Sequence, residues 1–341
     1  MININLIAIF ILFNLPILIF FNSLILKFNI YDHGDSKRKI HTHPISLFGG
    51  TIIIYNFIIA IIINFFFETF LIDKDFLISN RENFTFIFGS ILFYFLGLFD
   101  DKYILNSNKK FLLSFILVYL ILSIDETLII KEITLLDFDT IELYGFSKPF
   151  SILCFLLFLN ALNMFDGINL QAALYSLIIF FIFLLKNLNF NFNIIILFSL
   201  ILFLYFNYKN KCFLGDSGSN LLFFIISYTI IKNYNLDRSF QIEEIYILMF
   251  LPGLDMFRLF LFRLIKGNNP FKPDNEHIHH IILKLIKQKT KTALFIFFLN
   301  IFVIATYYFI SHELIYCIII TVLYFLFVYF VYFKIKSYEN S

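Results

Sequence analysis

Eleven apolar runs divide the chain, and they constrain its fold more than any other feature. A helix needs about 20 apolar residues to cross the hydrocarbon core of a bilayer, and fewer where partner helices cover its ends. Only 15% of the residues are charged, against roughly 25% in a soluble domain. The runs are approximately Ile2–Phe28, Leu47–Phe67, Phe84–Phe99, Phe111–Ile124, Phe150–Leu162, Leu170–Leu185, Phe192–Tyr208, Asn220–Ile231, Ile245–Ile265, Ala293–Ile310 and Leu314–Phe333. We therefore predict an all-α polytopic membrane protein with about eleven transmembrane helices, forming a single integral membrane domain over residues 1–341.

The Lys and Arg residues predict the orientation of these helices, because basic residues concentrate on the cytoplasmic side. With the N-terminus outside, the cytoplasmic segments hold 19 of the 26 basic residues, whereas 14 of the 24 acids lie outside. The C-terminus is then cytoplasmic. The cytoplasmic loops that carry candidate site residues are expected at about 29–46, 100–110, 163–169, 209–219 and 266–292.

Charge and cysteine usage exclude several classes of protein. The net charge is only +2 and there is no long basic run, so the chain lacks the electrostatic footprint of a nucleic-acid-binding protein. Cys154, Cys212 and Cys317 are too widely spaced for a disulfide framework or a zinc site, and we interpret them as structural thiols. Residues 125–148 alternate apolar and polar side chains, which predicts a small external hairpin.

The first polar cluster on the cytoplasmic side runs from Ser36 to Pro44 and is followed by Gly49-Gly50. Its candidate residues are Arg38, Lys39 and His41. A basic loop beside a membrane span is often only the positive-inside signal. The histidines and the paired glycines favour phosphate recognition as well, because cations and open backbone amides both bind oxyanions.

The second cluster, Gly97-Leu98-Phe99-Asp100-Asp101, ends an apolar run and is followed by Lys110. Two adjacent carboxylates at a membrane interface must stay hydrated or meet a cation. They are therefore either a hydrated helix end or a candidate base or metal-binding pair.

The third cluster places Asn160, Asn163 and Asp166 at spacings of three residues, on one helix face, before Gly167. Such a stripe can serve hydrogen bonds between helices. Two amides and a carboxylate in line also offer oxygen ligands to a hard cation.

The fourth cluster, Phe213-Leu214-Gly215-Asp216-Ser217-Gly218-Ser219, stands immediately before a new apolar run. Open backbone amides, the positive end of a helix and the Asp216 carboxylate would all face one point there, which suits a magnesium ion bridging to a phosphate. The plainer alternative is a Ser/Gly turn with Ser219 as the N-cap of the helix.

The fifth cluster runs from Asn268 to His280 and contains His277, His279 and His280. Three histidines in four residues indicate a phosphate clamp, proton transfer or, less readily without nearby cysteines, a zinc site. Asp255 in the ninth run stands three residues before Arg258, and we interpret the two as a structural ion pair.

Taken in order, these motifs resemble those of the polyprenyl-phosphate N-acetylhexosamine-1-phosphate transferases, the MraY/WecA superfamily in glycosyltransferase family 4. The resemblance covers roughly residues 30–285, and the His-Ile-His-His sequence resembles the WecA and TagO branch. It implies transfer of a sugar phosphate, most simply GlcNAc-1-phosphate, from a UDP-N-acetylhexosamine to undecaprenyl phosphate at the cytoplasmic face of a bacterial plasma membrane. UMP is released, and lipid-linked glycan synthesis begins. Other UDP-N-acetyl sugars, such as FucNAc or QuiNAc, are the alternative donors.

The resemblance also implies roles for individual residues. Asp216 and Asn163 would bind Mg²⁺, for which Mn²⁺ can substitute. Catalytic roles would fall to Asp100, as base or assistant, to Asp101, which positions the site, and to Asp166 and Asp216. Substrate-binding roles would fall to Arg38, Lys39, His41, Lys110, Asn160, Asn169, Phe213, His277, His279 and His280.

Two positions beside these motifs depart from the family pattern. After Asp166-Gly167 the pattern usually continues with an acid and a glycine, whereas Asn169 and Leu170 stand here.

A secondary transporter is the alternative from another class, but a transporter would place its polar residues near the bilayer midplane rather than at one face. The sequence leaves open whether the protein forms a homodimer.

Overall fold

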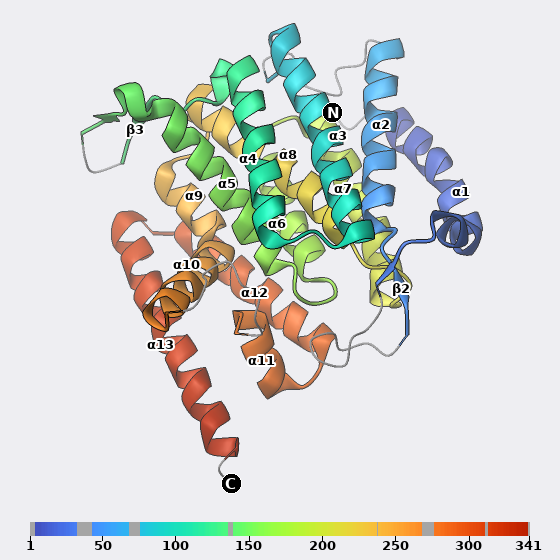
Figure 1. Ribbon diagram of the computed structural model, residues 1–341. Coiled ribbons are helices and arrows are strands. Elements are labelled where there is room, and N and C mark those ends of the chain that lie inside the picture. Colours follow the sequence, from blue (N-terminus) through green and yellow to red (C-terminus); the bar gives the residue numbers. More distant parts are fainter. Residues whose placement is uncertain are drawn as a thin grey trace. The chain divides into compact units, whose positions relative to one another are not determined.

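The structure is a computed structural model, and it describes residues 4–32, 43–67, 76–135, 139–236, 238–267, 276–310 and 313–339. Helices dominate it, and each of the eleven predicted runs coincides with a helix or a broken pair of helices (Figure 1). Seven helices are long and apolar enough to cross a membrane, or eight if one bent pair counts as a single span. The prediction of an all-α, multi-pass membrane protein is confirmed, whereas eleven spans and their orientation stay predictions.

The ninth run, predicted as one continuous segment, is broken. It forms α9 (Ile242–Leu248) and α10 (Phe250–Ile265), which meet at an angle of 77°. Pro252 has no N–H to donate to the Leu248 carbonyl, so the helical ladder is interrupted at this point. The Tyr175 hydroxyl donates to that carbonyl instead. The break therefore leaves no unsatisfied backbone acceptor at Leu248.

Backbone contacts group the chain into two compact units. Unit 1 comprises residues 1–105 and 176–226, and unit 2 comprises residues 106–175 and 227–341. The elements of unit 1 are α1 (Ile4–Phe28), β1 (Tyr31–Asp32), β2 (Ile45–Ser46), α2 (Gly49–Phe67), α3 (Asn80–Tyr103), most of α6 (Gln171–Leu185), α7 (Phe190–Tyr208) and the first half of α8 (Gly215–Leu236). The single domain predicted over the whole chain stays a prediction.

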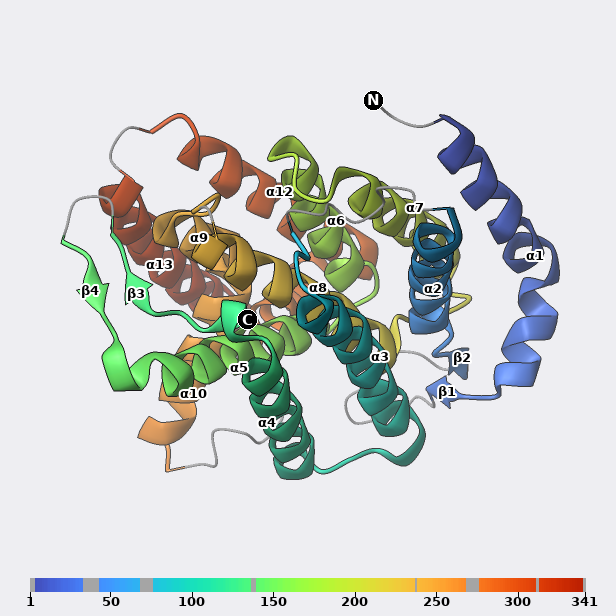
Figure 2. The ribbon, with the colours of Figure 1, turned by 90° about the horizontal axis from the view of Figure 1, so that it is seen from above.

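In unit 1, α1, α2 and α7 pack together through a small apolar core (Figure 2). Phe10 of α1, Ala60 of α2 and Ile195 of α7 all belong to it. Asn14 and Asn56 also exchange two side-chain hydrogen bonds, of 2.6 and 3.0 Å, between α1 and α2. Reciprocal amide bonds of this kind hold apolar helices together where burial alone gives little preference.

Unit 2 contains the remaining elements. These are α4 (Ser107–Ile124), η1 (Glu126–Leu128), β3 (Glu132–Ile133), β4 (Ile141–Glu142), η2 (Tyr144–Phe146), α5 (Ser147–Phe165), the second half of α8, α9, α10, α11 (Ile278–Ile286), α12 (Lys289–Tyr307) and α13 (Glu313–Glu339). The short helix α11 was not among the predicted runs; His277 is its N-cap, and His279 and His280 lie in its first turn.

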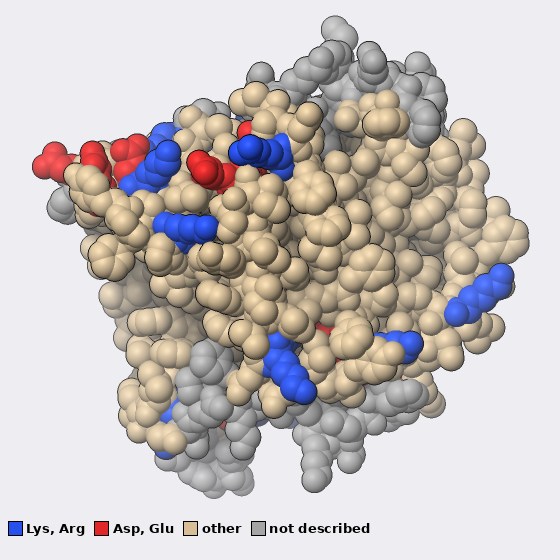
Figure 3. Space-filling model, turned by 45° about the horizontal axis from the view of Figure 1, so that its top comes forward, with Lys and Arg blue, Asp and Glu red and all other residues tan. Residues whose placement is uncertain are grey.

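The predicted hairpin is present, because β3 and β4 pair antiparallel with Glu132 opposite Glu142. Acidic side chains gather at this end of unit 2 (Figure 3). Those that are exposed are Glu126, Glu132, Asp139 and Glu142.

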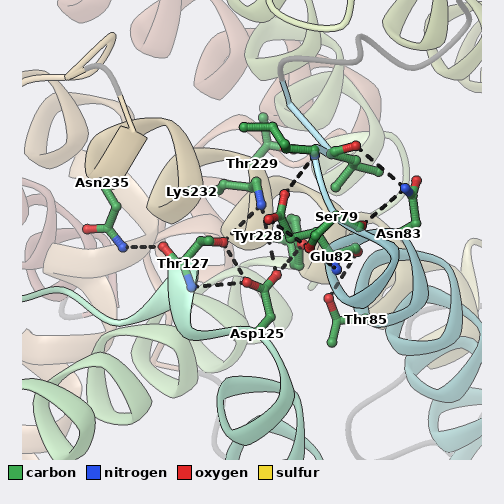
Figure 4. A network of polar contacts seen from close by, with 12 residues as sticks. Ser79, Glu82, Asn83, Thr85, Asp125, Thr127, Tyr228, Thr229, Lys232 and Asn235 are labelled. Atoms are coloured by element: carbon green, nitrogen blue, oxygen red, sulfur yellow. Dashed lines mark hydrogen bonds and ion pairs between the residues drawn. The ribbon is translucent and has the colours of Figure 1, made fainter.

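A buried polar network in unit 2 attaches α8 to η1 (Figure 4). The Asp125 carboxylate accepts the Tyr228 hydroxyl at 2.6 Å, and Lys232 Nζ donates to Thr127 Oγ1 at 2.9 Å. Lys232 is fully buried, with its Nζ 3.9 Å from Asp125. Lys232 lies within α8. The three cysteines are free thiols, as predicted.

Candidate active site

The carboxyl end of α3 and the first turn of α8 form one contact, which we call the α3–α8 junction (Gly97, Asp101, Asp216 and Ser217). Asp101 Oδ1 accepts the backbone N–H of Asp216 at 2.7 Å, and Oδ2 accepts that of Ser217 at 3.0 Å. The first N–H groups of a helix have no partner within the helix, so a carboxylate there satisfies them and complements the helix dipole. Asp101 therefore fixes the position of the turn that carries Asp216.

Gly97 allows the two helices of this junction to approach each other. A Cβ atom at Gly97 would lie 2.1 Å from the Asp216 carbonyl oxygen and 2.4 Å from the Ser217 nitrogen. These are backbone atoms, which cannot move aside as a flexible side chain can. Gly97 is thus required by the close packing of α3 against α8.

The glycines after the first cluster have a packing role as well, and this corrects the sequence interpretation. The Gly49 and Gly50 amides donate to the carbonyls of Phe213 and Leu214, at 3.0 and 2.9 Å. They are therefore not open to an oxyanion. The amides of Asp216 and Ser217, which we also expected to face a phosphate, are bound by Asp101.

The start of α8 differs from the capping alternative that the sequence suggested. The helix begins at Gly215, and Ser219 lies inside it, where its hydroxyl donates to the Gly215 carbonyl at 3.0 Å. Ser219 is therefore not the N-cap. Phe213 is half-buried, and its backbone N–H donates to the Ser46 carbonyl at 2.8 Å.

The two adjacent carboxylates of α3 serve different partners. Asp100 is buried, and its Oδ1 accepts the Leu105 N–H at 2.7 Å, in the turn that ends α3. Asp101 binds α8 instead. The two carboxylates therefore have different partners, and Asp216 is half-buried on α8. A role for the two as a base or metal-binding pair stays a prediction.

In unit 2, the third cluster lies at the carboxyl end of α5. Asn160 donates to the Leu156 carbonyl of its own helix at 2.7 Å. The helix ends at Phe165, and Asp166 is its C-cap, with its N–H on the Asn163 carbonyl at 3.2 Å. The helix thus ends one residue before Asp166, which was predicted as the last residue of the polar stripe on its face. Asn163, Asp166 and Asn169 are all half-buried.

The turn after this cluster contains an uncommon backbone conformation. Leu170 has φ of +74°, in the left-handed region that glycine adopts without strain and bulky residues rarely adopt. This is one of the positions where the chain departs from the pattern of the family that it resembles. The substitution of the usual glycine is therefore accommodated at the cost of backbone strain.

The three histidines at the start of α11, His277, His279 and His280, form what we call the histidine cluster. The rings of His277 and His279 are nearly parallel, with centroids 5.4 Å apart, and the His280 ring lies 4.3 Å from that of His279. A Cβ atom on Gly167 would fall 1.8 Å from His279 Nε2. Because Gly167 has no side chain, the His279 ring can pack against the turn that follows α5.

His279 is 1% exposed, and neither of its ring nitrogens has a hydrogen-bond partner within the part of the chain that the structure describes. Burial lowers the pKa of its imidazole well below the ordinary value, and His280 and His277 lower it further. The ring is therefore neutral near pH 7. His279 offers a polar N–H and a lone pair rather than the positive charge expected of a phosphate clamp.

Asp255 of α10 joins the histidine cluster through His277. Its Oδ2 lies 2.8 Å from His277 Nδ1, while Oδ1 accepts from Arg258 Nη2 at 2.7 Å. Oδ1 also accepts the Ile278 N–H and the Tyr324 hydroxyl, each at 3.1 Å. The predicted ion pair with Arg258 is present, but the contact with His277 was not anticipated.

The remaining predicted residues lie elsewhere. Lys110 is half-buried in the first turn of α4 in unit 2. Arg38, Lys39 and His41 lie outside the described residues, as does the stretch 268–275 that precedes the histidine cluster.

Comparisons with known proteins bear on these motifs. Residues 83–233 match the model of glycosyl transferase family 4. A probable undecaprenyl-phosphate N-acetylglucosaminyl 1-phosphate transferase of Bacillus subtilis is 27% identical over 205 residues, which are 57% of this chain and 56% of that protein. Undecaprenyl-phosphate alpha-N-acetylglucosaminyl 1-phosphate transferase of Escherichia coli K12 is 33% identical over 78 residues, or 22% of this chain and 21% of that protein. Residues 83–233 belong to glycosyl transferase family 4.

The family 4 region contains the α3–α8 junction and the end of α5, and it ends before the histidine cluster. A Pasteurella multocida protein named as the same alpha-N-acetylglucosaminyl 1-phosphate transferase is 32% identical over 84 residues, which are 22% of its length. The chain thus spans about half or less of the curated relatives it matches.

The donor chemistry of the predicted metal ligands fits a hard cation. Asp216 and Asn163 both offer oxygen, the ligand that Mg²⁺ prefers. Within the described residues, no three His, Cys, Asp or Glu side chains come together as a metal site.

Sequence reasoning gave three residues no part in the site, although it named them: Gly97, Gly167 and Asp255. Gly97 and Gly167 have structural consequences that their motifs suggested only indirectly, since each stands close to an acidic candidate. Asp255 had a visible signal, an acid inside an apolar run, but its long-range partner His277 is 22 residues away. The short spacing in the sequence had instead indicated Arg258, three residues away, as the partner of Asp255.

Proposed function

We propose that the protein transfers an N-acetylhexosamine-1-phosphate, with GlcNAc-1-phosphate as the first candidate, from a UDP-sugar to undecaprenyl phosphate. UMP is the second product, and the lipid diphosphate sugar initiates a cell-surface glycan such as O-antigen or teichoic acid. The observation that carries the proposal is the family 4 match over the residues of the α3–α8 junction, supported by the activities for which the relatives are named.

The reaction needs electrostatic help more than proton transfer. Attack by one phosphate on a diphosphate brings several negative charges together, and fixed cations and hydrogen-bond donors reduce their repulsion. A bound Mg²⁺ would supply most of this stabilisation, with Asp216 and Asn163 as its proposed ligands. A general base contributes less, because the second ionisation of a phosphate monoester has a pKa near 6.

The described residues divide the other tasks. Asp101 holds the Asp216 turn through two backbone amides. Asp100 is the proposed base or assisting acid, and Phe213 and Asn169 are proposed to contact the nucleotide. Lys110 and the histidine cluster are proposed to bind phosphate groups, together with Arg38, Lys39 and His41.

The direct test is to incubate membranes containing the folded protein with undecaprenyl phosphate, Mg²⁺ and a panel of UDP-sugars. UDP-GlcNAc should release UMP and yield a lipid-linked product, and UDP-FucNAc and UDP-QuiNAc test the alternative donors. Absence of UMP with every donor would reject the proposed reaction.

A matched pair of variants tests the metal role. Asp216→Ala should reduce turnover to background in correctly inserted protein, because a proposed metal ligand is lost. Asp139→Ala removes an exposed acid of the β3–β4 hairpin and should leave turnover unchanged. Near-normal activity of Asp216→Ala would remove this residue from the metal role.

The cytoplasmic orientation is tested separately. Single cysteines introduced at Lys148, in the first turn of α5, and at Lys209, after α7, should react with an impermeant reagent from opposite sides. Labelling of both from one side would contradict the proposed topology.

A further inference from the structure

The buried network around Asp255 has a consequence for the histidine cluster. Asp255 is 2% exposed, and the hydrogen bonds that it receives from the described residues come from α10, α13 and the start of α11 with its N-cap His277. A buried carboxylate is costly unless several donors satisfy it. Here Oδ1 has three donors, whereas Oδ2 faces the imidazole of His277 alone among the described residues.

The donors indicate where the proton lies in the Asp255–His277 contact. The guanidinium of Arg258 and two further donors on Oδ1 favour the ionised carboxylate. An ionised carboxylate only accepts hydrogen bonds, so His277 Nδ1 must carry the proton at the 2.8 Å contact. Asp255 thereby selects both the tautomer and the orientation of the ring.

The opposite ring nitrogen is left for a ligand. His277 is 8% exposed, and its Nε2 has no hydrogen-bond partner in the described part of the chain. Arg258 reinforces the arrangement, since its Nη2 also donates to the Glu276 carbonyl at 2.6 Å. Side chain and backbone of the segment that carries His277 are thus both held by α10.

We propose that Asp255 is a positioning residue, which holds the His277 imidazole so that Nε2 meets a phosphate oxygen of the UDP-sugar. Nδ1–H stays on Asp255, so Nε2 donates to that oxygen through a second ring proton, taken up from solvent. This inference rests on the proposed function, and it extends the site from the histidine motif into α10. It replaces the interpretation of Asp255 and Arg258 as a merely structural pair.

A double-mutant cycle tests the proposal with UMP release as the readout. Asp255→Asn keeps the size of the side chain but loses the carboxylate. We expect kcat to fall about ten- to hundredfold, the loss typical when the partner that orients a metal-bound histidine is removed. His277→Gln should cause at least as large a loss. The double variant should be within about twofold of His277→Gln, because Asp255 acts only through His277.

Tyr316→Phe is the matched control, because Tyr316 lies on α13 like Tyr324. It removes a hydroxyl that donates to the Val303 carbonyl at 2.8 Å and contacts none of Asp255, Arg258 and His277 within the described structure, so its kcat should stay within about twofold of the wild type. If Asp255→Asn does not fold, Tyr324→Phe takes its place in the cycle. It removes one donor to Asp255 and should give a smaller loss that also disappears in the His277→Gln background.

The outcomes separate this inference from the proposed function. Losses that multiply in folded double variants would show that Asp255 acts independently of His277 and would overturn the positioning role. Wild-type activity in folded Asp255→Asn would overturn it as well, while leaving the transferase reaction intact. Absence of UMP from the wild type with every donor would reject the reaction itself.

Discussion

The α3–α8 junction of unit 1 and the histidine cluster of unit 2 carry similar numbers of polar candidates but use them differently. At the junction, Asp101 is bonded to two backbone amides, and Gly97 brings backbone against backbone. In the histidine cluster, His279 keeps two unpartnered ring nitrogens within the described structure. At the junction the carboxylate of Asp101 is fully used in holding the two helices together. The histidine cluster instead keeps ring nitrogens that can bind a ligand.

The largest expected effect comes from overfilling the junction. Gly97→Ala places a methyl group 2.1 Å from the Asp216 carbonyl oxygen, so α3 and α8 must separate. Overpacking typically costs 1–3 kcal/mol, and rigid backbone on the opposing side puts this variant near the upper end, at about 3 kcal/mol. Thermal unfolding in detergent measures the loss, and turnover should fall with it.

Gly145→Ala is the control for that variant, because no atom lies within 4 Å of the added Cβ. Its stability should match that of the wild type. Equal stability of Gly97→Ala and Gly145→Ala would contradict the close contact of α3 with α8.

Removing the acceptor at the junction should have the next largest effect. Asp101→Ala leaves the Asp216 and Ser217 amides without their partner, and hydrogen bonds to a charged group contribute about 1.5–3 kcal/mol each. Water can replace part of this, so we expect a loss of about 2 kcal/mol in the free energy of unfolding. Asp101→Asn keeps one acceptor oxygen and should lose about half as much. A larger loss for Asn than for Ala would contradict the capping role.

The burial of the histidine cluster should instead make the stability of the protein depend on pH. The pKa of His279 is lower in the folded protein than in the unfolded chain, so the unfolded chain binds more protons between these two pKa values. Stability is therefore fully present above the unfolded value of about 6.5 and decreases as pH falls below it, by up to about 1.4 kcal/mol per pH unit. His279→Gln should abolish this share of the slope. Identical slopes in the two proteins would show that His279 is not buried in the neutral form.

The sequence predicted the elements that depend on composition more closely than the contacts between them. Apolar runs located the helices because burial in a bilayer needs length and hydrophobicity, both of which are local properties. The break at Met249 was missed, since the proline that causes it lies within an otherwise uninterrupted apolar run. Hydropathy averages do not register the loss of one backbone donor.

The candidate residues followed the same division. The sequence predicted which motif each residue belongs to, but it did not predict their hydrogen-bond partners. The glycine amides assigned to an oxyanion are used by the carbonyls of Phe213 and Leu214, and Asp255 reaches His277 across 22 residues. Such pairings depend on which helices become neighbours, which spacing along one segment does not reveal.

The smallest expected effect concerns the strained turn beside Gly167, where the chain departs from the pattern of the family that it resembles. Leu170 is 7% exposed, so both Leu170→Gly and Leu170→Ala lose its buried side chain and should be destabilised. Only glycine is also relieved of the left-handed backbone penalty, roughly 1–2 kcal/mol for an L-residue, although it gains freedom in the unfolded chain. Leu170→Gly should therefore be more stable than Leu170→Ala by about 1 kcal/mol.

Leu162, fully buried within α5, provides the control. There Leu162→Ala should be more stable than Leu162→Gly by about 1 kcal/mol, because glycine is the poorer helix former. Unfolding of the four variants in detergent measures both differences, and the same order at the two positions would show that the Leu170 backbone is not strained.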